Sequence, residues 1–423
     1  MANAFTKQEK VMFDDLLEGF NDQLVMSALV EKFNMGDQEA ERSSDVIWRP
    51  VPYIAQSYSG IDQTGNFGDS VQLSVPAQIG TIRSSNFTLN AREMRDASQA
   101  SRKTDAAKQK LASDINIALM NTAANLGTQF VKRSAAASGY NDISEADAML
   151  NEQGIDMDNR YIALSSRDYN GMAGNLAARE TMNEKPTRAY EDSYVGLVAG
   201  FETHKLDYAN RLTAAAGTTV TIAAADQYYT PVATQASGNG YNQTNVDNRY
   251  QTISIAVGGG TVKVGDAFTI AGVNAVHHIT KEDTGQLKTF RITEIVTGSG
   301  GTGTVKISPP IVSNGGSTDA EAQYQNVTAT PANGAAITFL NTVTGSVNPF
   351  WRKGAMELLP SRLVIPTDAG LTSMSATTDQ GVSVLMTRQG DILDLSCKYR
   401  LDVFFGTAML LPEHAGLMMF SQT

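Results

Sequence analysis

Apolar residues recur every three to four positions in the first part of the chain, the spacing of one face of a helix. Residues 5 to about 33 are therefore expected to form an amphipathic arm with an apolar face of Phe13, Leu17, Phe20, Leu24 and Ala28. The other side carries an acidic stripe that includes Asp14, Asp15 and Glu18. Such a stripe is either a solvated face or a docking surface for a basic helix of a partner.

Two runs of alternating apolar and polar residues follow in residues 42–90, and a Gly-rich polar tip at 59–69 separates them. Alternation predicts strands. Pro50, Pro52 and Pro76 fall inside the runs, so these strands should be edge strands, which can lack a ladder N–H. The pattern predicts an extended two-stranded loop. Because an isolated hairpin is marginally stable, the loop is expected to rest on another part of the protein or on another subunit.

A long helix is predicted over residues 91–130, which contain no proline and a single glycine, Gly127. One side is lined by small and apolar residues, including Thr104, Leu111 and Ile115. At 1.5 Å per residue the helix would extend roughly 50 Å, more than most globular helices. It is therefore expected to act as a structural strut.

The composition changes twice after this helix. Residues 131–215 read as mixed α/β, with helices near 144–153 and 167–175, a strand at 161–164 and another in 196–207. Residues 216–343 are rich in Gly, Thr, Ser, Ala and Asn and favour short strands, the pattern of a small barrel or sandwich. The mixed pattern returns in 344–423, with a turn expected at Gln389-Gly390-Asp391. The β block thus interrupts a domain whose parts lie on both sides of it.

Length and charge narrow the class of protein. A chain of 423 residues is long for one core, so two or more units are expected. The net charge of −11 argues against tight wrapping of a nucleic acid but allows loose enclosure of one. Cys397 is the only cysteine, which excludes an internal disulfide and favours a reducing compartment. With no apolar run long enough for a membrane span, a soluble, unexported chain is expected.

The candidate chemical motifs have ordinary structural explanations. The GSGGTG stretch at 298–303 has dinucleotide-loop spacing, but a strand-like TVKIS follows where that motif needs a helix. His277 and His278 would point to opposite faces of a strand, Asp266 follows Gly265 where a turn residue is expected, and Cys397 is expected to be a small buried apolar residue. We therefore predict a non-enzyme without a cofactor or metal site.

Several motifs in sequence order carry a resemblance to a known family. They are FDDLLEG (13–19), RSSDVIWRPV (42–51), NVDNRY (245–250), GDAFTIAGV (265–273), NPFW (348–351), TRQGDILDLS (387–396) and FFGTAMLLPE (404–413). With the arm, loop, long helix and β insert, the chain resembles the major capsid proteins of tailed bacteriophages. It is most similar to the coat proteins of short-tailed Salmonella and Shigella phages, which carry an inserted β-barrel.

The resemblance implies an α+β Hong Kong phage-type capsid fold. In the domain names of that fold, the chain begins with an N-terminal arm (1–41), an extended loop (42–90) and the spine helix of a peripheral domain (91–130). These are followed by a first part of an axial domain (131–215), an inserted β-barrel (216–343) and return segments of the axial and peripheral domains (344–423).

The implied function is that of a shell subunit. Copies would form hexamers and pentamers of an icosahedral head, first as a procapsid around scaffolding protein, which expands as double-stranded DNA enters through the portal protein. Assembly would take place in the cytoplasm of the host bacterium and the product would be the virion capsid, with no membrane partner. The alternative is a phage tail or decoration protein that uses the β domain for surface binding.

The resemblance also assigns contact residues. A basic scaffold helix would dock on Asp14, Asp15 and Glu18. The extended loop would contact a neighbouring subunit, and its candidate residues are Trp48, Arg49, Asp62 and Asp69. The insert would contact other capsomers through a loop near 237–249, with candidate residues Tyr241, Asn242, Asn245, Asp247 and Arg249.

The chain departs from its relatives at two points. Residues 46–90 contain no lysine, so the lysine–asparagine crosslink that some relatives form through this loop is not expected. The insert loop, SGNGYNQTN at 237–245, has few charges, so neutral hydrogen bonds are expected to replace the salt bridges of relatives.

Overall fold

The computed structural model describes residues 7–33, 46–57, 59–64, 67–93, 97–178, 193, 195–206, 210–236, 243–363, 372–391 and 393–423. The chain forms two compact units, each described here by itself. Unit 1 consists of Met1–Ile47, Pro76–Thr122 and Met356–Ala408. Unit 2 consists of Trp48–Val75, Ala123–Ala355 and Met409–Thr423.

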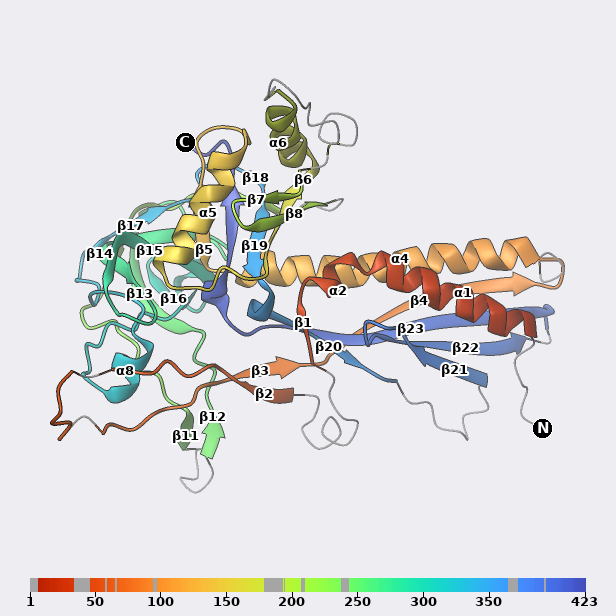
Figure 1. Cartoon of the computed structure of the whole chain (residues 1–423), viewed down its shortest axis with the longest axis horizontal. Coiled ribbons are helices and arrows are strands. Elements are labelled where there is room, and N and C mark those ends of the chain that lie inside the picture. The colour runs from red at the N-terminus through yellow and green to blue at the C-terminus, as the bar shows by residue number, and fades with distance from the viewer. Residues whose placement is uncertain are drawn as a thin grey trace. The chain divides into compact units, whose positions relative to one another are not determined.

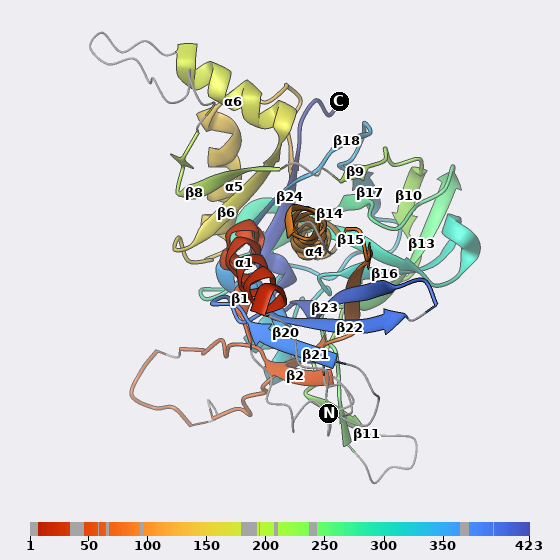
Figure 2. The ribbon, with the colours of Figure 1, turned by 90° about the vertical axis from the view of Figure 1, so that its right-hand side faces the viewer.

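Unit 1 is built from helices on one side of a sheet (Figures 1 and 2). In the described residues, six strands form this sheet: β1 (Glu31–Lys32), β20 (Met356–Ser361), β23 (Ser396–Met409), β22 (Ser383–Asp391) and β21 (Thr372–Thr377) in spatial order, with β4 (Thr81–Asn90) paired to β23. The helices are α1 (Lys7–Gln23), the short α2 (Val25–Ala28) and the long α4 (Ala97–Leu126). Alternating residues of β22 and β23 face the helices and are buried, among them Val384, Met386, Leu401, Val403 and Phe405.

The predicted arm is helical, but its buried face differs from the prediction. Phe13, Phe20 and Leu24 are buried as expected, whereas Leu16 is buried in place of Leu17, and Ala28 is exposed. The exposure of Ala28 follows from a break in the helix: Leu24 has the non-helical angles φ −83° and ψ 58°, and α2 begins after it. The apolar spacing therefore cannot continue in phase from α1 into α2.

The long helix is confirmed over 30 residues, or about 45 Å, but it is shorter than the predicted 91–130: residues 91–93 form a turn and a strand begins at Gln129. Leu111, Ile115 and Leu119 are almost completely buried along it. Near the C-terminus, the turn predicted at 389–391 is wrong. Strand β22 continues through Asp391, and the turn lies at 393–395, where Leu395 has φ 53°. The predicted buried position of Cys397 is also wrong, since this residue in β23 is only half-buried.

One glycine in β23 lies so close to a neighbouring backbone that a side chain at its position can be tested. A Cβ on Gly406 would lie 2.2 Å from the carbonyl oxygen of Gln78 and 2.9 Å from the Ile79 Cα, and backbone atoms cannot move away cheaply. Gly406→Ala is expected to lower the free energy of unfolding by about 3 kcal/mol. Gly390→Ala in β22 is the matched control, since its Cβ would have no neighbour within 4 Å. Urea unfolding checks both; equal stability of the two variants would contradict this packing.

Unit 2 contains a second sheet with two helices packed against it. Its strand order in the described residues is β5 (Gln129–Lys132), β24 (Ala415–Met419), β19 (Asn348–Arg352), β6 (Arg160–Ser165), β8 (Phe201–Leu206) and β7 (Leu197–Val198). Helices α5 (Tyr140–Glu152) and α6 (Ser166–Ala178) supply Ile143, Leu150 and Met172 to a core with Ile162 and Phe350. The helices and the strand at 161–164 expected in 131–215 are confirmed, and the one strand expected in 196–207 is instead the antiparallel pair β7 and β8.

The predicted β-barrel is present in unit 2. The strands β10 (Thr218–Ile222), β13 (Gln251–Gly259), β16 (Gly303–Ser308), β15 (Asp283–Ile295), β14 (Ala267–Val276) and β17 (Ala336–Phe339) close on one another around an apolar core. Just outside it, β9 (Arg211–Leu212) pairs with β18 (Gly345–Ser346), so the chain enters and leaves the barrel side by side. The expectation of short strands is wrong for β15, which has 13 residues, and a helix, α8 (Asp319–Tyr324), is also present.

The motifs of the β block lie in turns. Residues Gly298–Gly300 form a short 3-10 helix, η1, and strand β16 follows, as the sequence indicates. Asp266 closes a turn, because its N–H donates to the Lys263 carbonyl at 3.2 Å. His277 and His278 are not in a strand as expected: β14 ends at Val276 and a turn begins there.

The extended loop is paired only at its base in the described residues, where β2 (Val46–Pro50) and β3 (Ser74–Gln78) form a two-stranded sheet that contains Pro50 and Pro76. The predicted loop runs to residue 90, whereas β4 over 81–90 pairs along its whole length with β23 in the sheet of unit 1. Strands β11 (Thr234–Ala236) and β12 (Gln243–Asn245) form a second small ribbon, at the insert loop.

Candidate functional site

The acidic positions of the arm lie on the solvent side of α1. Asp14 and Asp15 are exposed, while Phe13 and Leu16, their neighbours in sequence, are buried against the rest of unit 1. The side chain of Glu18, the third predicted residue, lies outside the described atoms. Since a helix turns 100° per residue, burying Phe13, Leu16 and Phe20 leaves Asp14 and Asp15 on its outer side.

An ion pair holds α1 on the sheet of unit 1. Glu9 is 9% exposed, and its carboxylate accepts a hydrogen bond from Arg388 of β22 at 2.6 Å and one from the hydroxyl of Tyr399 of β23 at 2.7 Å. Burial, together with the Glu9 carboxylate, raises the pKa of Tyr399 above its usual range, so the hydroxyl stays a donor. These contacts fix the rotation of the helix and thereby the direction in which Asp14 and Asp15 face.

Glu9→Gln offers a test of this anchor. The amide keeps one acceptor oxygen but removes the negative charge from its contact with Arg388, so the free energy of unfolding is expected to fall by about 2 kcal/mol. Asp105→Asn on α4, an exposed carboxylate beside Lys108, is the control and is expected to change stability by less than about 0.5 kcal/mol. Thermal unfolding of the two variants compares them, and an unchanged Glu9→Gln variant would disprove the anchor.

The predicted loop residues have different environments. Trp48 and Arg49 are half-buried in β2, whereas Asp62 and Asp69 are exposed. The Asp62 carboxylate accepts a bond from the N–H of Thr64 at 2.9 Å, and hydrogen bonding to Thr64 lowers its pKa. The structure therefore does not bring these four candidates together into one cluster.

The charged residues of the insert loop are engaged within the chain. The Arg249 guanidinium donates to both carboxylate oxygens of Asp247, at 2.8 and 2.6 Å, and also to the Met409 carbonyl at 2.7 Å. Asn245 is exposed at the end of β12, while Tyr241 and Asn242 lie outside the described residues. Of the candidates that are described, Asn245 is the one with an exposed polar side chain.

Unit 2 also contains a buried ionic cluster that the sequence analysis did not identify. Lys288 of β15 is 0% exposed, and its ammonium lies 2.6 Å from the Glu413 carboxylate in the 3-10 turn η4 (Pro412–His414). Asn326 donates to the same Glu413 oxygen at 3.1 Å, and Lys288 also donates to Gln153 at 3.1 Å. The cluster therefore joins the barrel to the segment that leads into β24.

Burial sets the protonation of this cluster. Burial opposes the charge of Glu413, but the nearby Lys288 overcomes it and lowers the pKa to about 2. Burial lowers the pKa of His278 to about 4 and of His414 to about 3, so both imidazoles are neutral near pH 7. A buried pair of this kind stabilises the barrel position only while both charges are present.

A second set of contacts from β15 also joins the barrel to the rest of unit 2. Buried Arg291 donates to the carbonyls of Ala124 and Gly127 where α4 ends, and the Thr289 hydroxyl donates to the Thr128 carbonyl at 3.0 Å. Burial lowers the pKa of Arg291 to about 10, which still leaves it charged. The only signal in the sequence is that Lys288 and Arg291 interrupt an otherwise strand-like run, and this does not reveal their partners.

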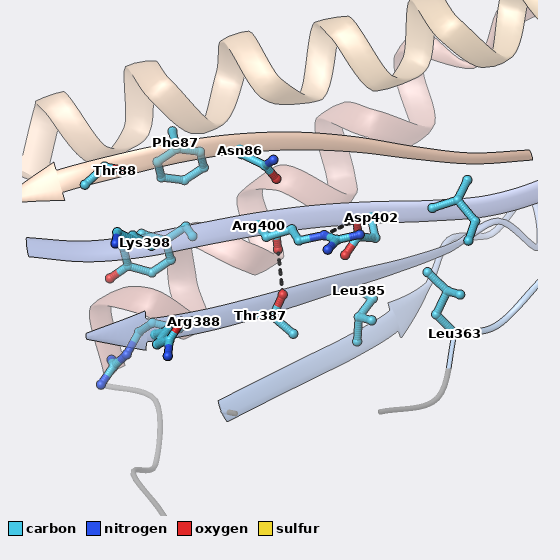
Figure 3. Close-up of a pocket in the computed structure, with 13 residues that line it drawn as sticks. Asn86, Phe87, Thr88, Leu363, Leu385, Thr387, Arg388, Lys398, Arg400 and Asp402 are labelled. Carbon is cyan, nitrogen blue, oxygen red and sulfur yellow. Dashed lines mark hydrogen bonds and ion pairs between the residues drawn. The ribbon is translucent and has the colours of Figure 1, made fainter. Parts of the chain in front are cut away.

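Unit 1 has an open groove on the outer face of its sheet, with a volume of about 730 Å³ (Figure 3). Side chains of β4, β22 and β23 line it, and its charges are paired: Arg400 with Asp402 at 2.8 Å, and Lys398 with Asp391 at 3.0 Å. In the described part of the chain, no group of three His, Cys, Asp or Glu side chains is arranged to hold a metal ion. Among the described helices, none has the length and apolarity to cross a membrane.

Comparison with known proteins identifies the family to which the chain belongs. The family model described as "P22 coat protein - gene protein 5" matches residues 1–421. The chain therefore belongs to the P22 coat protein family: it is a tailed-phage major capsid protein with the α+β Hong Kong phage-type fold and an added β-barrel. Its role is structural, as part of the virion capsid, and the alternative of a tail or decoration protein is not supported.

Solved structures of phage origin are similar to the chain. A protein of Mycobacterium phage Che8 has 10% identity and a TM-score of 0.43, with 93% of this chain and 90% of that chain covered. A capsid structure of cyanophage P-SCSP1u has 10% identity and a TM-score of 0.42, with 93% and 86% covered. The CUS-3 coat protein I-domain has 43% identity and a TM-score of 0.23, with 29% of this chain and 95% of that chain covered.

Proposed function

We propose that copies of this capsid protein form hexamers and pentamers that close into an icosahedral head through a scaffold-dependent procapsid, assembled in the cytoplasm of the host bacterium. The procapsid would expand as double-stranded DNA enters through the portal protein. The net charge of −11 supports enclosure of the DNA without tight binding, because a negative protein repels a polyanion on average.

The observation that carries the scaffold step is the pair of adjacent carboxylates, Asp14 and Asp15, on the exposed side of an anchored helix. Two exposed charges of one sign on a fixed helix suit a partner with basic residues at helical spacing. Glu18, one turn further along the helix, would extend this surface. The scaffold contact would then be electrostatic and would weaken with added salt.

Scaffold incorporation tests the docking surface. In Asp14→Ala/Asp15→Ala, the amount of scaffolding protein per particle is expected to fall about five-fold, and the remaining binding should depend less on salt. Asp379→Ala, an exposed carboxylate elsewhere in unit 1, should bind scaffold like the unmodified protein. Sedimentation of assembled particles followed by gel quantification measures both. Normal incorporation in the double variant would rule out the docking surface.

The other contacts of the proposal involve the loop and the insert. We place the extended loop over a neighbouring subunit, with Trp48, Arg49, Asp62 and Asp69 as its candidate contact residues. In the insert loop, Arg249 and Asp247 already bind each other, so contacts to other capsomers would depend on neutral groups such as Asn245. Many weak interfaces of this kind add up in a closed shell and still allow errors to dissociate.

The lack of lysine in residues 46–90 leads to a prediction about mature particles. Without a loop amine, no isopeptide bond to a neighbouring asparagine can form there, so particles boiled in denaturant should release chains of 45.3 kDa. Mass spectrometry under denaturing conditions is the measurement. A ladder of covalent multimers would contradict the prediction.

A further inference from the structure

The extended loop is bound to the barrel just after its tip (Figure 1). The N–H of Asp69 donates to the Asp319 carboxylate at 3.1 Å, and the N–H of Val71 donates to the side-chain carbonyl of Gln323 at 3.1 Å. In the other direction, the Tyr324 hydroxyl donates to the Val71 carbonyl at 2.8 Å. Both donors and the acceptor on the loop are backbone groups, so α8 fixes the path of the loop whatever side chains it carries.

The fit between the loop and α8 is close. A Cβ on Gly68 would lie 2.7 Å from the Asp319 carboxylate, so a larger residue at this position would displace the side chain that accepts from Asp69. Gln323 is 5% exposed, and in the described part of the chain its Nε2 has no hydrogen-bond partner. The Val71 N–H binds the oxygen of this amide, so the loop pairs one of the two polar atoms of the buried side chain.

Helix α8 is itself fixed to the barrel domain. The Thr318 hydroxyl caps it by accepting from the N–H of Glu321. Glu321 is fully buried and accepts from the N–H of Gly316 at 2.7 Å and from the hydroxyl of Thr230. A helix of six residues is not stable alone, so these contacts hold α8 in place as a support for the loop.

The described part of the loop tip exposes two large apolar side chains. Ile61 is 104% exposed and Phe67, the residue before Gly68, is 91% exposed. Leaving such side chains in water gives up roughly 2 kcal/mol each compared with burial. The contacts of α8 begin directly after Phe67, so the loop backbone is fixed while the apolar tip stays uncovered.

We propose that α8 is a bracket that holds the extended loop so that Ile61 and Phe67 bind an apolar surface on a second copy of this chain. The second copy is the occupant favoured by family membership, because this protein assembles with itself into a capsid. The inference rests on the proposed function, in which the loop contacts a neighbour. It adds that the barrel positions the loop before assembly, so that less conformational freedom is lost when copies meet.

The bracket is tested with Asp319→Ala/Gln323→Ala in the full chain. Asp319→Asn is the matched control, since it keeps an oxygen that can accept from Asp69. Hydrogen exchange over residues 67–73 should become about ten-fold faster in the double variant, and scaffold-assisted assembly, followed by light scattering, should slow about ten-fold. The control should match the unmodified protein in both, and unchanged exchange elsewhere in the barrel shows that the variants fold.

The tip is tested separately with Phe67→Ser, which leaves the backbone contacts to α8 in place. It should keep slow exchange over residues 67–73 and yet assemble about ten-fold more slowly, while Val264→Ser, at an exposed apolar residue of the barrel, should assemble normally. Normal assembly of Phe67→Ser would overturn the proposed loop contact itself. Normal assembly of the Asp319/Gln323 double variant, with Phe67→Ser impaired, would overturn only the bracket, as would unchanged exchange in the double variant.

Discussion

Lys288→Met is expected to lower the free energy of unfolding of unit 2 by about 4 kcal/mol. Methionine fills nearly the same volume, so the loss reports charge and hydrogen bonding more than packing. Without the ammonium at 2.6 Å, the carboxylate of Glu413, whose side chain is 18% exposed, loses its counter-charge and keeps Asn326 as a donor. Urea unfolding followed by tryptophan fluorescence suits the measurement, because Trp351 in the same unit is fully buried.

Two further variants make this result specific. Lys306→Met removes a partly exposed lysine of the same barrel, 3.6 Å from Glu294, and should cost less than about 0.5 kcal/mol. The double variant Lys288→Met/Glu413→Leu removes both charges and should recover at least about half of the loss, because no buried charge is left unpaired. If Lys288→Met is as stable as the unmodified protein, the ion pair does not hold the barrel in place.

Acid is expected to destabilise the same unit, by about 6 kcal/mol between pH 7 and pH 4. Burial lowers the pKa of His278 from 6.5 to about 4 and that of His414 from 6.5 to about 3. Because the unfolded chain binds these protons more readily than the folded one, stability is complete above pH 6.5 and falls as the pH decreases. Glu413, with its pKa lowered from 4.5 to about 2, adds a further loss below about pH 4.5.

Most of the charged groups that face these imidazoles also lower their pKa, and Glu413 raises it. Lys288, Lys281 and Arg352 are cations that oppose a second positive charge, and Glu413 is the one carboxylate among the groups acting on either ring. In His278→Gln/His414→Gln, most of the pH dependence between 6.5 and 4.5 should disappear. His277→Gln, at a half-exposed position of the same turn, should keep it. Urea midpoints measured across this range provide the comparison, and a double variant with the original slope would refute the assignment.

Local pattern was enough to predict much of the fold. The helical spacing of Leu111 and Ile115 gave α4, and the composition change after residue 215 indicated the barrel. The pattern misled at two places, one where a helix breaks and one where a strand continues. Leu24 interrupts the helix and exposes Ala28, and β22 continues through the supposed Gln-Gly-Asp turn because Asp391 pairs with Ser396.

The sites could be predicted only in part. The exposed position of Asp14 and Asp15 follows from the amphipathic spacing of α1, because a buried apolar face determines the opposite one. The pairing of Asp247 with Arg249, two residues apart, was not anticipated although both were named. Lys288 and Glu413 lie on distant segments, and only the closing of the barrel against β24 brings them together. A single sequence carries no local signal for such a pair.

The order of strands in the second sheet has a consequence for synthesis of the protein. β24 pairs with β5 on one side and with β19 on the other, and a Cβ on its Gly416 would meet Gln129 and Phe350 on these two neighbours. Both neighbours leave the ribosome before β24, so the sheet stays divided until the strand after Glu413 arrives. A prematurely released chain would lack the strand that joins the two parts of this sheet.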